Sequence, residues 1–318
     1  MALTASHLEA FYAVSQTLNF TRAAANLRLT QSALSQRIIN LEEELGTALF
    51  IRDRAGLKLT ETAFNLVRYC QMKDHLENEF VSGLKNENSK ELSGLVRIGG
   101  FSSVTASVLV PIVAELIKEH PRIKLQIMTS EVHDLFDLLK RGEIDYMILD
   151  DRLDRQELER IHLGKEKNFL AKAKNASVGE VYLDHDEKDE TTYQYLKLTK
   201  MKLKNIERHY LDNIYGLIEG VKSGLGKAVL PYHILKNEKT IEIVNEALFL
   251  EIPVYLYFYS RPYYSKLHEV LIKELKVGFQ RRLSEENVAP NALMRALTHP
   301  FCASFFSSRL FCQLFSFL

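Results

Sequence analysis

The stretch that decides the fold runs from Phe20 to Thr60 and reads FTRAAANLRLTQSALSQRIINLEEELGTALFIRDRAGLKLT. Thr21 can cap a short helix, which the Leu29-Thr30 pair then ends. A second helix is predicted to begin near Gln31, because apolar residues recur at helical spacing at Leu34, Ile38, Leu41 and Leu45. Gly46, which can adopt the left-handed conformation, ends it. Two short helices joined by a tight turn form a helix-turn-helix, whose second helix is the candidate DNA-recognition helix.

The face of this second helix that lies opposite the apolar stripe is mainly polar. Ser32, Ser35, Gln36 and Ile39 lie together on it, and Gln31 at the start of the helix is a further candidate for DNA contact. The Gln36 amide can bridge N6 and N7 of adenine. No acidic residue lies between Phe20 and Leu41, so phosphates could be engaged by the arginines of this stretch, which are Arg22, Arg28 and Arg37. A helical hairpin with a solvated polar face, in any soluble protein, would give the same pattern.

A hairpin-like wing is predicted after the second helix. Segments 49–52 and 57–59 flank a turn at residues 53–56 (Asp-Arg-Ala-Gly). Arg52 and Arg54 could reach the DNA backbone or a minor groove, where negative potential favours arginine. A solvated turn with basic residues explains each arginine equally well. Before the helix-turn-helix, a first helix over residues 3–18 is expected to close a three-helix core.

Residues 23–60 closely resemble the N-terminal winged helix-turn-helix of LysR-type transcriptional regulators. The matching features are the paired alanines, TQSALS, the Ile-x-x-Leu-Glu run, Leu-Gly, Leu-Phe-x-Arg and the closing Leu-Thr. Two positions depart from the family pattern: Ile39 stands where a basic residue is frequent, and Phe64 replaces a glycine. The resemblance implies a sequence-specific regulator with four kinds of partner: double-stranded DNA at a pseudo-palindromic promoter site, a small-molecule effector, further copies of itself, and RNA polymerase.

One long helix is predicted from Thr60, its cap, to about Lys85. Its apolar face begins with Ala63, Leu66, Val67 and Cys70, and such a face outside a domain needs a partner. In the family this is the linker helix that pairs two subunits, so the resemblance implies a homodimer or a homotetramer. Residues 85–91 (KNENSKE) form a polar hinge.

From residue 92 onward, strands and helices alternate. Strands are predicted over residues 95–99, 123–128, 145–149, 178–183, 201–206, 227–230 and 255–259. Helices are predicted over residues 103–119, 132–140, 213–223 and 265–283. This order indicates an α/β fold with a mostly parallel sheet. The run from Gly220 to Pro231 resembles the family's second effector subdomain, which implies two α/β subdomains of periplasmic-binding-protein type.

The chain therefore divides into a winged helix-turn-helix (1–60), a linker helix and hinge (61–91), an effector-binding regulatory domain (92–284) and an atypical tail (285–318). Ligands of open parallel sheets bind outside the carboxyl ends of the strands. The candidate effector-binding residues at such ends are Ser102, Ser103, Thr129, Ser130 and Asp150, with Asp151 beside them. Simpler roles remain open, because a serine can merely cap the helix and paired acids are often solvated. The effector's identity is not given by the sequence.

Other classes of protein fit less well. The start of the chain is unlike a signal peptide, no apolar run is long enough for a membrane span, and the three cysteines have no metal spacing, so a cytoplasmic protein without metal or cofactor is expected. Catalytic motifs are missing from the sequence, which favours a protein that is not an enzyme. The tract 184–190 (DHDEKDE) invites a metal hypothesis, but a charged surface loop explains it more simply.

The rival hypothesis comes from another class of protein. It is a ligand-binding or dimerisation module whose N-terminal helices bind a protein partner, and the apolar Ile39 on the outer helix face is its main support. The tail from residue 285 holds two of the three cysteines and is rich in phenylalanine. A partner-binding segment, a membrane-leaning segment and a non-native ending all fit it, and no function is assigned to it.

Overall fold

The computed structural model describes residues 3–54, 56–85, 91–130, 132–150, 153, 155–198 and 206–284. Its N-terminal part has three helices and a hairpin: α1 (Ala5–Thr17), α2 (Phe20–Asn26), α3 (Gln31–Leu45), β1 (Phe50–Asp53) and β2 (Gly56–Leu59). Phe11 and Val14 of α1 pack with Leu34 and Leu41 of α3 in one buried core. The helix-turn-helix and its wing are therefore present as predicted.

The helix ends differ from prediction at one place. Asn19, not Thr21, caps α2: its backbone is extended and its Oδ1 accepts a hydrogen bond from the Arg22 N–H at 3.0 Å. The Thr21 prediction was wrong because the chain is already helical at that residue, and a cap residue needs an extended backbone. Helix α3 begins at Gln31 and ends at Gly46, which has φ +65°, as predicted.

Helix α4 (Glu61–Lys85) is one continuous helix that extends from the N-terminal part. The Thr60 hydroxyl accepts a hydrogen bond from the Ala63 N–H at 3.1 Å, so the predicted cap is confirmed. The first turns bury their apolar face in the N-terminal core, and burial there raises the pKa of the Cys70 thiol to about 12. Farther along, Phe80 is 68% exposed. The predicted hinge lies almost wholly outside the described residues, and the tail 285–318 lies wholly outside them.

The regulatory part is built on a seven-stranded sheet with the strand order β10-β6-β11-β5-β3-β4, in which β9 also pairs with β6. Its strands are β3 (Ser93–Gly100), β4 (Arg122–Thr129), β5 (Tyr146–Leu149), β6 (Leu158–Ala173), β9 (Ala228–Pro231), β10 (Ile241–Ile243) and β11 (Leu250–Tyr259). Strands β3, β4 and β5 are parallel, as predicted, whereas the pairs formed by β6 and β11 are antiparallel. The prediction of a mostly parallel sheet was therefore wrong for the whole sheet.

Two helical layers cover this sheet. One consists of α5 (Ser102–Val104), the π-helical η1 (Thr105–Leu109), α6 (Val110–Glu119) and α11 (Lys266–Ser284), and the other is α7 (Val132–Lys140). Because strand side chains alternate between faces, Ile148 and Leu256 pack in the first layer's core and their neighbours Met147 and Tyr257 pack under α7. In the described part of the chain, no helix combines the length and hydropathy that a membrane crossing requires.

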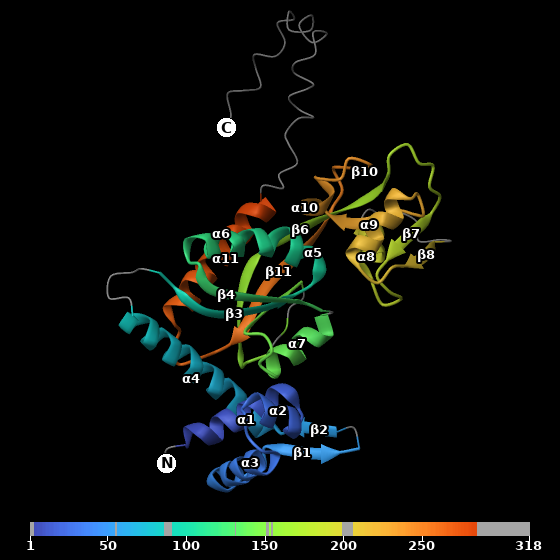
Figure 1. The fold of residues 1–318 in the computed structure, drawn as a ribbon. Helices are drawn as coiled ribbons and strands as arrows, with labels where there is room; N and C mark the ends of the chain where they lie inside the picture. The colour runs from blue at the N-terminus through green and yellow to red at the C-terminus, as the bar shows by residue number, and fades with distance from the viewer. Residues whose placement is uncertain are drawn as a thin grey trace, which may run out of the picture.

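The long strands β6 and β11 run side by side from this first subdomain into a second one (Figure 1). The second subdomain adds the parallel pair β7 (Val181–Asp184) and β8 (Glu207–Tyr210), with α8 (Thr191–Leu198), α9 (Ile214–Lys222) and α10 (Tyr232–Leu235). The strand predicted at 201–206 falls outside the described residues except for Ile206. Figure 1 shows the winged helix-turn-helix at one end of the molecule and the second subdomain at the other.

Candidate DNA interface and ligand cavity

The recognition helix α3 presents one face to the core and the other to solvent. Leu34, Ile38 and Leu41 are buried, at 0%, 3% and 0% exposure. The Thr30 hydroxyl fixes the start of the helix by accepting a hydrogen bond from the Ala33 N–H at 3.2 Å. The face of the N-terminal turns that lies opposite this buried stripe is therefore open to solvent. A recognition helix contacts base edges with the residues of these turns.

The predicted contact residues of α3 lie on this outer side. Gln31, Ser32, Gln36 and Ile39 are exposed, and Ser35 and Arg37 are half-buried. The Gln36 Nε2 donates a hydrogen bond to Asn40 Oδ1 at 2.8 Å, which orients its amide. Because an amide nitrogen carries two hydrogens, one of them stays available for a base. The 45% exposure of Ile39 offers an apolar surface suited to a thymine methyl group.

The arginines predicted to contact DNA flank this face. Arg22 on α2, and Arg52 and Arg54 on the wing, are exposed. The Arg52 guanidinium lies over the Phe20 ring, 5.4 Å from its centroid. A groove of about 320 Å³ separates the wing from the start of α2 and is lined by both Arg52 and Gln31. The groove thus places Arg52 of the wing beside Gln31 at the start of α3.

In the regulatory part, all five predicted effector-binding residues line one cavity of about 490 Å³. They come from the carboxyl ends of the three parallel strands: Ser102 and Ser103 follow β3, Thr129 and Ser130 end β4, and Asp150 follows β5. The Ser130 N–H donates to the Gly100 carbonyl at 3.4 Å, which ties two of these strand ends together. Asp151 lies outside the described residues.

The opposite wall of the cavity comes from the second subdomain and was not predicted. Its residues are His185, Asp186, Lys188, Asp189, Thr191, Asp212, Asn213 and Ile214. The first four of them belong to the charged tract 184–190 that we interpreted as a surface loop. Asn213 caps α9 by accepting from the Gly216 N–H at 2.9 Å, and such a cap was the sequence signal that could have located this part of the wall.

Hydrogen bonds within the charged tract, residues 184–190, fix its turn. Asp186 Oδ1 accepts from the backbone N–H groups of Lys188 and Asp189, at 2.6 and 2.9 Å. Although burial opposes it, hydrogen bonds from Thr191 and from the His185 N–H lower the pKa of Asp189. Among the residues that the structure describes, no group of three or more histidine, cysteine or acidic side chains could hold a metal ion.

A buried row of polar groups lies where the two subdomains meet. Ser107 Oγ is 2.7 Å from His233 Nδ1, and His233 Nε2 is 2.6 Å from Glu166 Oε1. The row resembles a serine-histidine-acid triad, but the Ser107 hydroxyl donates to the Ser103 carbonyl at 2.6 Å. His233 then supplies the hydrogen between the two side chains and cannot act as the base for Ser107. The row instead joins η1, strand β6 and α10.

These features define a class: a winged helix-turn-helix joined by a long helix to a two-subdomain α/β domain with a cavity between the subdomains. The family model for bacterial regulatory helix-turn-helix proteins of the LysR family matches residues 5–63, and the model for the LysR substrate binding domain matches residues 89–280. The chain belongs to the LysR family of transcriptional regulators.

Individual relatives agree with this assignment. The transcriptional activator IlvY of Haemophilus influenzae is 34% identical over 140 residues, which span 43% of this chain and 47% of IlvY. The structure of ArgP from Mycobacterium tuberculosis has a TM-score of 0.71 at 17% identity, covering 87% of this chain and 98% of ArgP. Full-length LysG from Corynebacterium glutamicum with bound effector Arg has a TM-score of 0.66 at 17% identity, with the same coverage. The curated relatives are regulators, which confirms that the chain is not an enzyme.

Proposed function

We propose that this regulator binds a pseudo-palindromic promoter site in the cytoplasm as a homodimer or homotetramer. The observation that carries the proposal is helix α3, whose apolar stripe is buried and whose outer face presents Ser32, Gln36 and Ile39. Gln31 at the start of this helix and Arg52 of the wing line one groove, so base edges and phosphates can be contacted together.

Pairing of two subunits through α4 is the second part of the proposal. Along this helix, Tyr69, Leu76, Phe80 and Val81 are 41–68% exposed. Large apolar side chains gathered on one helix are suited to burial against a second copy. Two recognition helices would then face two half-sites about one helical turn of DNA apart, or a multiple of it.

A small-molecule effector in the 490 Å³ cavity is the third part of the proposal. Serine and threonine hydroxyls on one wall and acidic side chains on both walls suit a ligand that carries hydroxyl or ammonium groups. LysG, which resembles this chain in fold, has a bound effector, Arg, in its structure. An effector changes promoter binding only through its different affinities for two conformations of the regulator. No cofactor is proposed, and contact with RNA polymerase remains a proposal from the family alone.

The wing arginines should act on DNA through charge. We expect Arg54→Ala to weaken binding to specific and random DNA alike and to flatten the slope of log affinity against log salt by about 0.9, because one phosphate contact is lost. Fluorescence anisotropy over a salt series measures this slope. Arg281→Ala removes the same charge from α11, far along the chain, and is the matched control. An unchanged slope for Arg54→Ala would rule out its contact with phosphate.

The function itself is tested by selecting genomic fragments with the purified full-length protein and footprinting them across a salt series. A protected pseudo-palindrome with steeply salt-dependent affinity supports the proposal, and genes beside it suggest effectors to try. Salt-dependent binding without sequence preference would remove the role given to α3. No binding at low salt would favour the alternative, a module whose N-terminal helices bind a protein through the exposed Ile39.

A further inference from the structure

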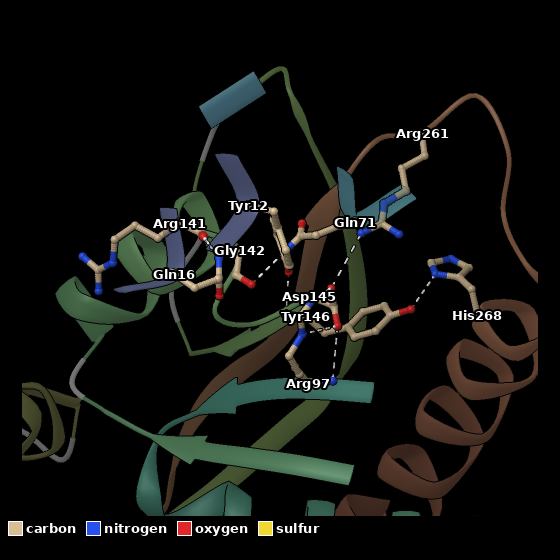
Figure 2. A network of polar contacts seen from close by, with 10 residues as sticks. All are labelled: Tyr12, Gln16, Gln71, Arg97, Arg141, Gly142, Asp145, Tyr146, Arg261 and His268. Carbon is tan, nitrogen blue, oxygen red and sulfur yellow. Dashed lines mark hydrogen bonds and ion pairs between the residues drawn. The ribbon is translucent and has the colours of Figure 1, made fainter. Parts of the chain in front are cut away.

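The N-terminal domain is docked on the first regulatory subdomain through a buried polar contact (Figure 2). Arg97 on β3 donates to Asp145 through Nε and Nη2, at 3.0 and 2.9 Å. The two side chains are only 12% and 1% exposed. Arg97 Nη1 also donates to the hydroxyl of Tyr12, on α1, at 3.3 Å. A charged pair of the regulatory domain is thus completed by a phenol of the DNA-binding domain.

A second contact joins α4 to the loop after α7. Gln71 Nε2 donates to the Gly142 carbonyl at 2.7 Å, and this bond is buried. Gly142 has φ +69°, and a Cβ placed on it would lie 2.1 Å from Gln71 Nε2 and 2.8 Å from Val67 Cγ1. The helix therefore lies directly against the backbone of this loop, and a side chain at position 142 would displace the Gln71 amide and press on Val67.

Smaller contacts surround these two. Lys140 Nζ lies 2.9 Å from Glu61 Oε2 and 4.4 Å from the centroid of the Phe64 ring. Phe64, which departs from the family pattern, therefore contacts a cation of the regulatory domain. On the same side, the Arg68 guanidinium lies 4.2 Å from the centroid of the Tyr259 ring. We call the whole contact of α1 and α4 with Arg97, Tyr259 and residues 140–145 the docking seam.

The docking seam lies on the strands that also form the cavity. Asp145 N–H donates to the Arg97 carbonyl at 2.8 Å, and residues 98–100 of β3 then pair with residues 146–148 of β5. Ser102 and Asp150 follow within five residues of Arg97 and Asp145 and line the cavity. At about 3.3 Å per residue, the docking seam and the cavity are on the order of 15 Å apart along either strand.

We propose that the docking seam positions the recognition helix relative to the regulatory domain and thereby restricts the half-site spacings that the assembled regulator accepts. The inference rests on the proposed DNA-binding function. With the seam closed, α1 and α4 are held to the regulatory domain at separate points, so α3 has a fixed orientation. With the seam open, α4 alone connects them and α3 samples a wider range of positions. Tyr12, Gln71 and Gly142 are positioning residues in this sense.

The test compares two glycine substitutions that share backbone strain but differ at the seam. Gly142→Ala places a methyl group against Gln71, whereas Gly224→Ala, at φ +75°, has open space around its Cβ. Tyr12→Phe is a milder second variant, which removes only the hydroxyl that meets Arg97. Dissociation constants are measured on the selected site and on copies with two to five base pairs inserted between the half-sites, and on a single half-site.

We expect wild-type protein to prefer the selected spacing by at least about tenfold, and we expect the control Gly224→Ala to do the same. In Gly142→Ala and in Tyr12→Phe this preference should fall about three- to tenfold, while the affinity for a single half-site stays unchanged. Hydrogen exchange without DNA should be faster in α1 and residues 141–145 of both seam variants. Intact spacing preference in both seam variants would overturn the inference, as would equal weakening on all DNAs. Wild-type protein that binds no specific site would instead overturn the proposed function, and this inference with it.

Discussion

Replacing Asp145 by alanine should lower the free energy of unfolding by about 3–5 kcal/mol, because it leaves a buried guanidinium without its carboxylate. Asp145 is 3% exposed and accepts from the Arg97 side chain and from the Arg97 backbone N–H at 3.3 Å. Although burial opposes it, the Asp145 carboxylate raises the pKa of Arg97 above its ordinary value. Removing Asp145 takes this stabilisation away, but a guanidinium keeps its proton in proteins, so Arg97 stays charged and its desolvation is no longer compensated. Urea unfolding of the full chain, followed by circular dichroism, measures the loss.

Two controls separate the buried charge from the loss of a side chain. The double variant Arg97→Met/Asp145→Leu should recover much of the stability, because an apolar pair of similar volume needs no compensating charge. Glu115→Ala breaks an ion pair with Arg281 whose members are 57% and 49% exposed, and it should change stability by less than about 1 kcal/mol. If Asp145→Ala were as mild as Glu115→Ala, the buried pair would have no special role in the fold.

The elements that the sequence predicted well are those determined by neighbouring residues. The start of α3 at Gln31, its end at Gly46 and the cap at Thr60 all depend on residues within one helical turn. The cavity residues of the first subdomain were also found, because the carboxyl ends of neighbouring parallel strands must lie at one edge of the sheet. Whether these residues bind an effector remains a prediction.

What the sequence did not predict depends on contacts between distant residues. Strand β6 carries charged residues such as Glu159, Lys165 and Lys167, so its pattern lacks the apolar character of a central strand. Tyr12 meets Arg97 across 85 positions in sequence, and no local signal marks that contact. The second wall of the cavity was missed for the same reason, since the turn of the charged tract faces the cavity only after the crossover strands place the second subdomain.

Gln36→Ala should lower the preference for the selected DNA site by about 1–3 kcal/mol, because a bidentate amide contact to adenine is lost. The hydrogen bond from Gln36 Nε2 to Asn40 Oδ1 orients the amide before DNA is bound, so little side-chain freedom has to be lost on binding. The methyl side chain of alanine can neither donate to N7 nor accept from N6. Selection from a randomised site measures the base preference at each position.

The informative result is a loss confined to one base pair in each half-site. Gln36→Ala should tolerate all four bases there and keep the wild-type preference elsewhere, whereas removal of a phosphate contact weakens binding to every sequence alike. Glu43→Ala is the matched control on the same helix, near its C-terminal end, and should shift the affinity for all sequences by one common factor. Equal losses on specific and random DNA for Gln36→Ala would exclude base recognition by this residue and leave Ser32, Ser35 and Ile39 as the groups on α3 that can contact base edges.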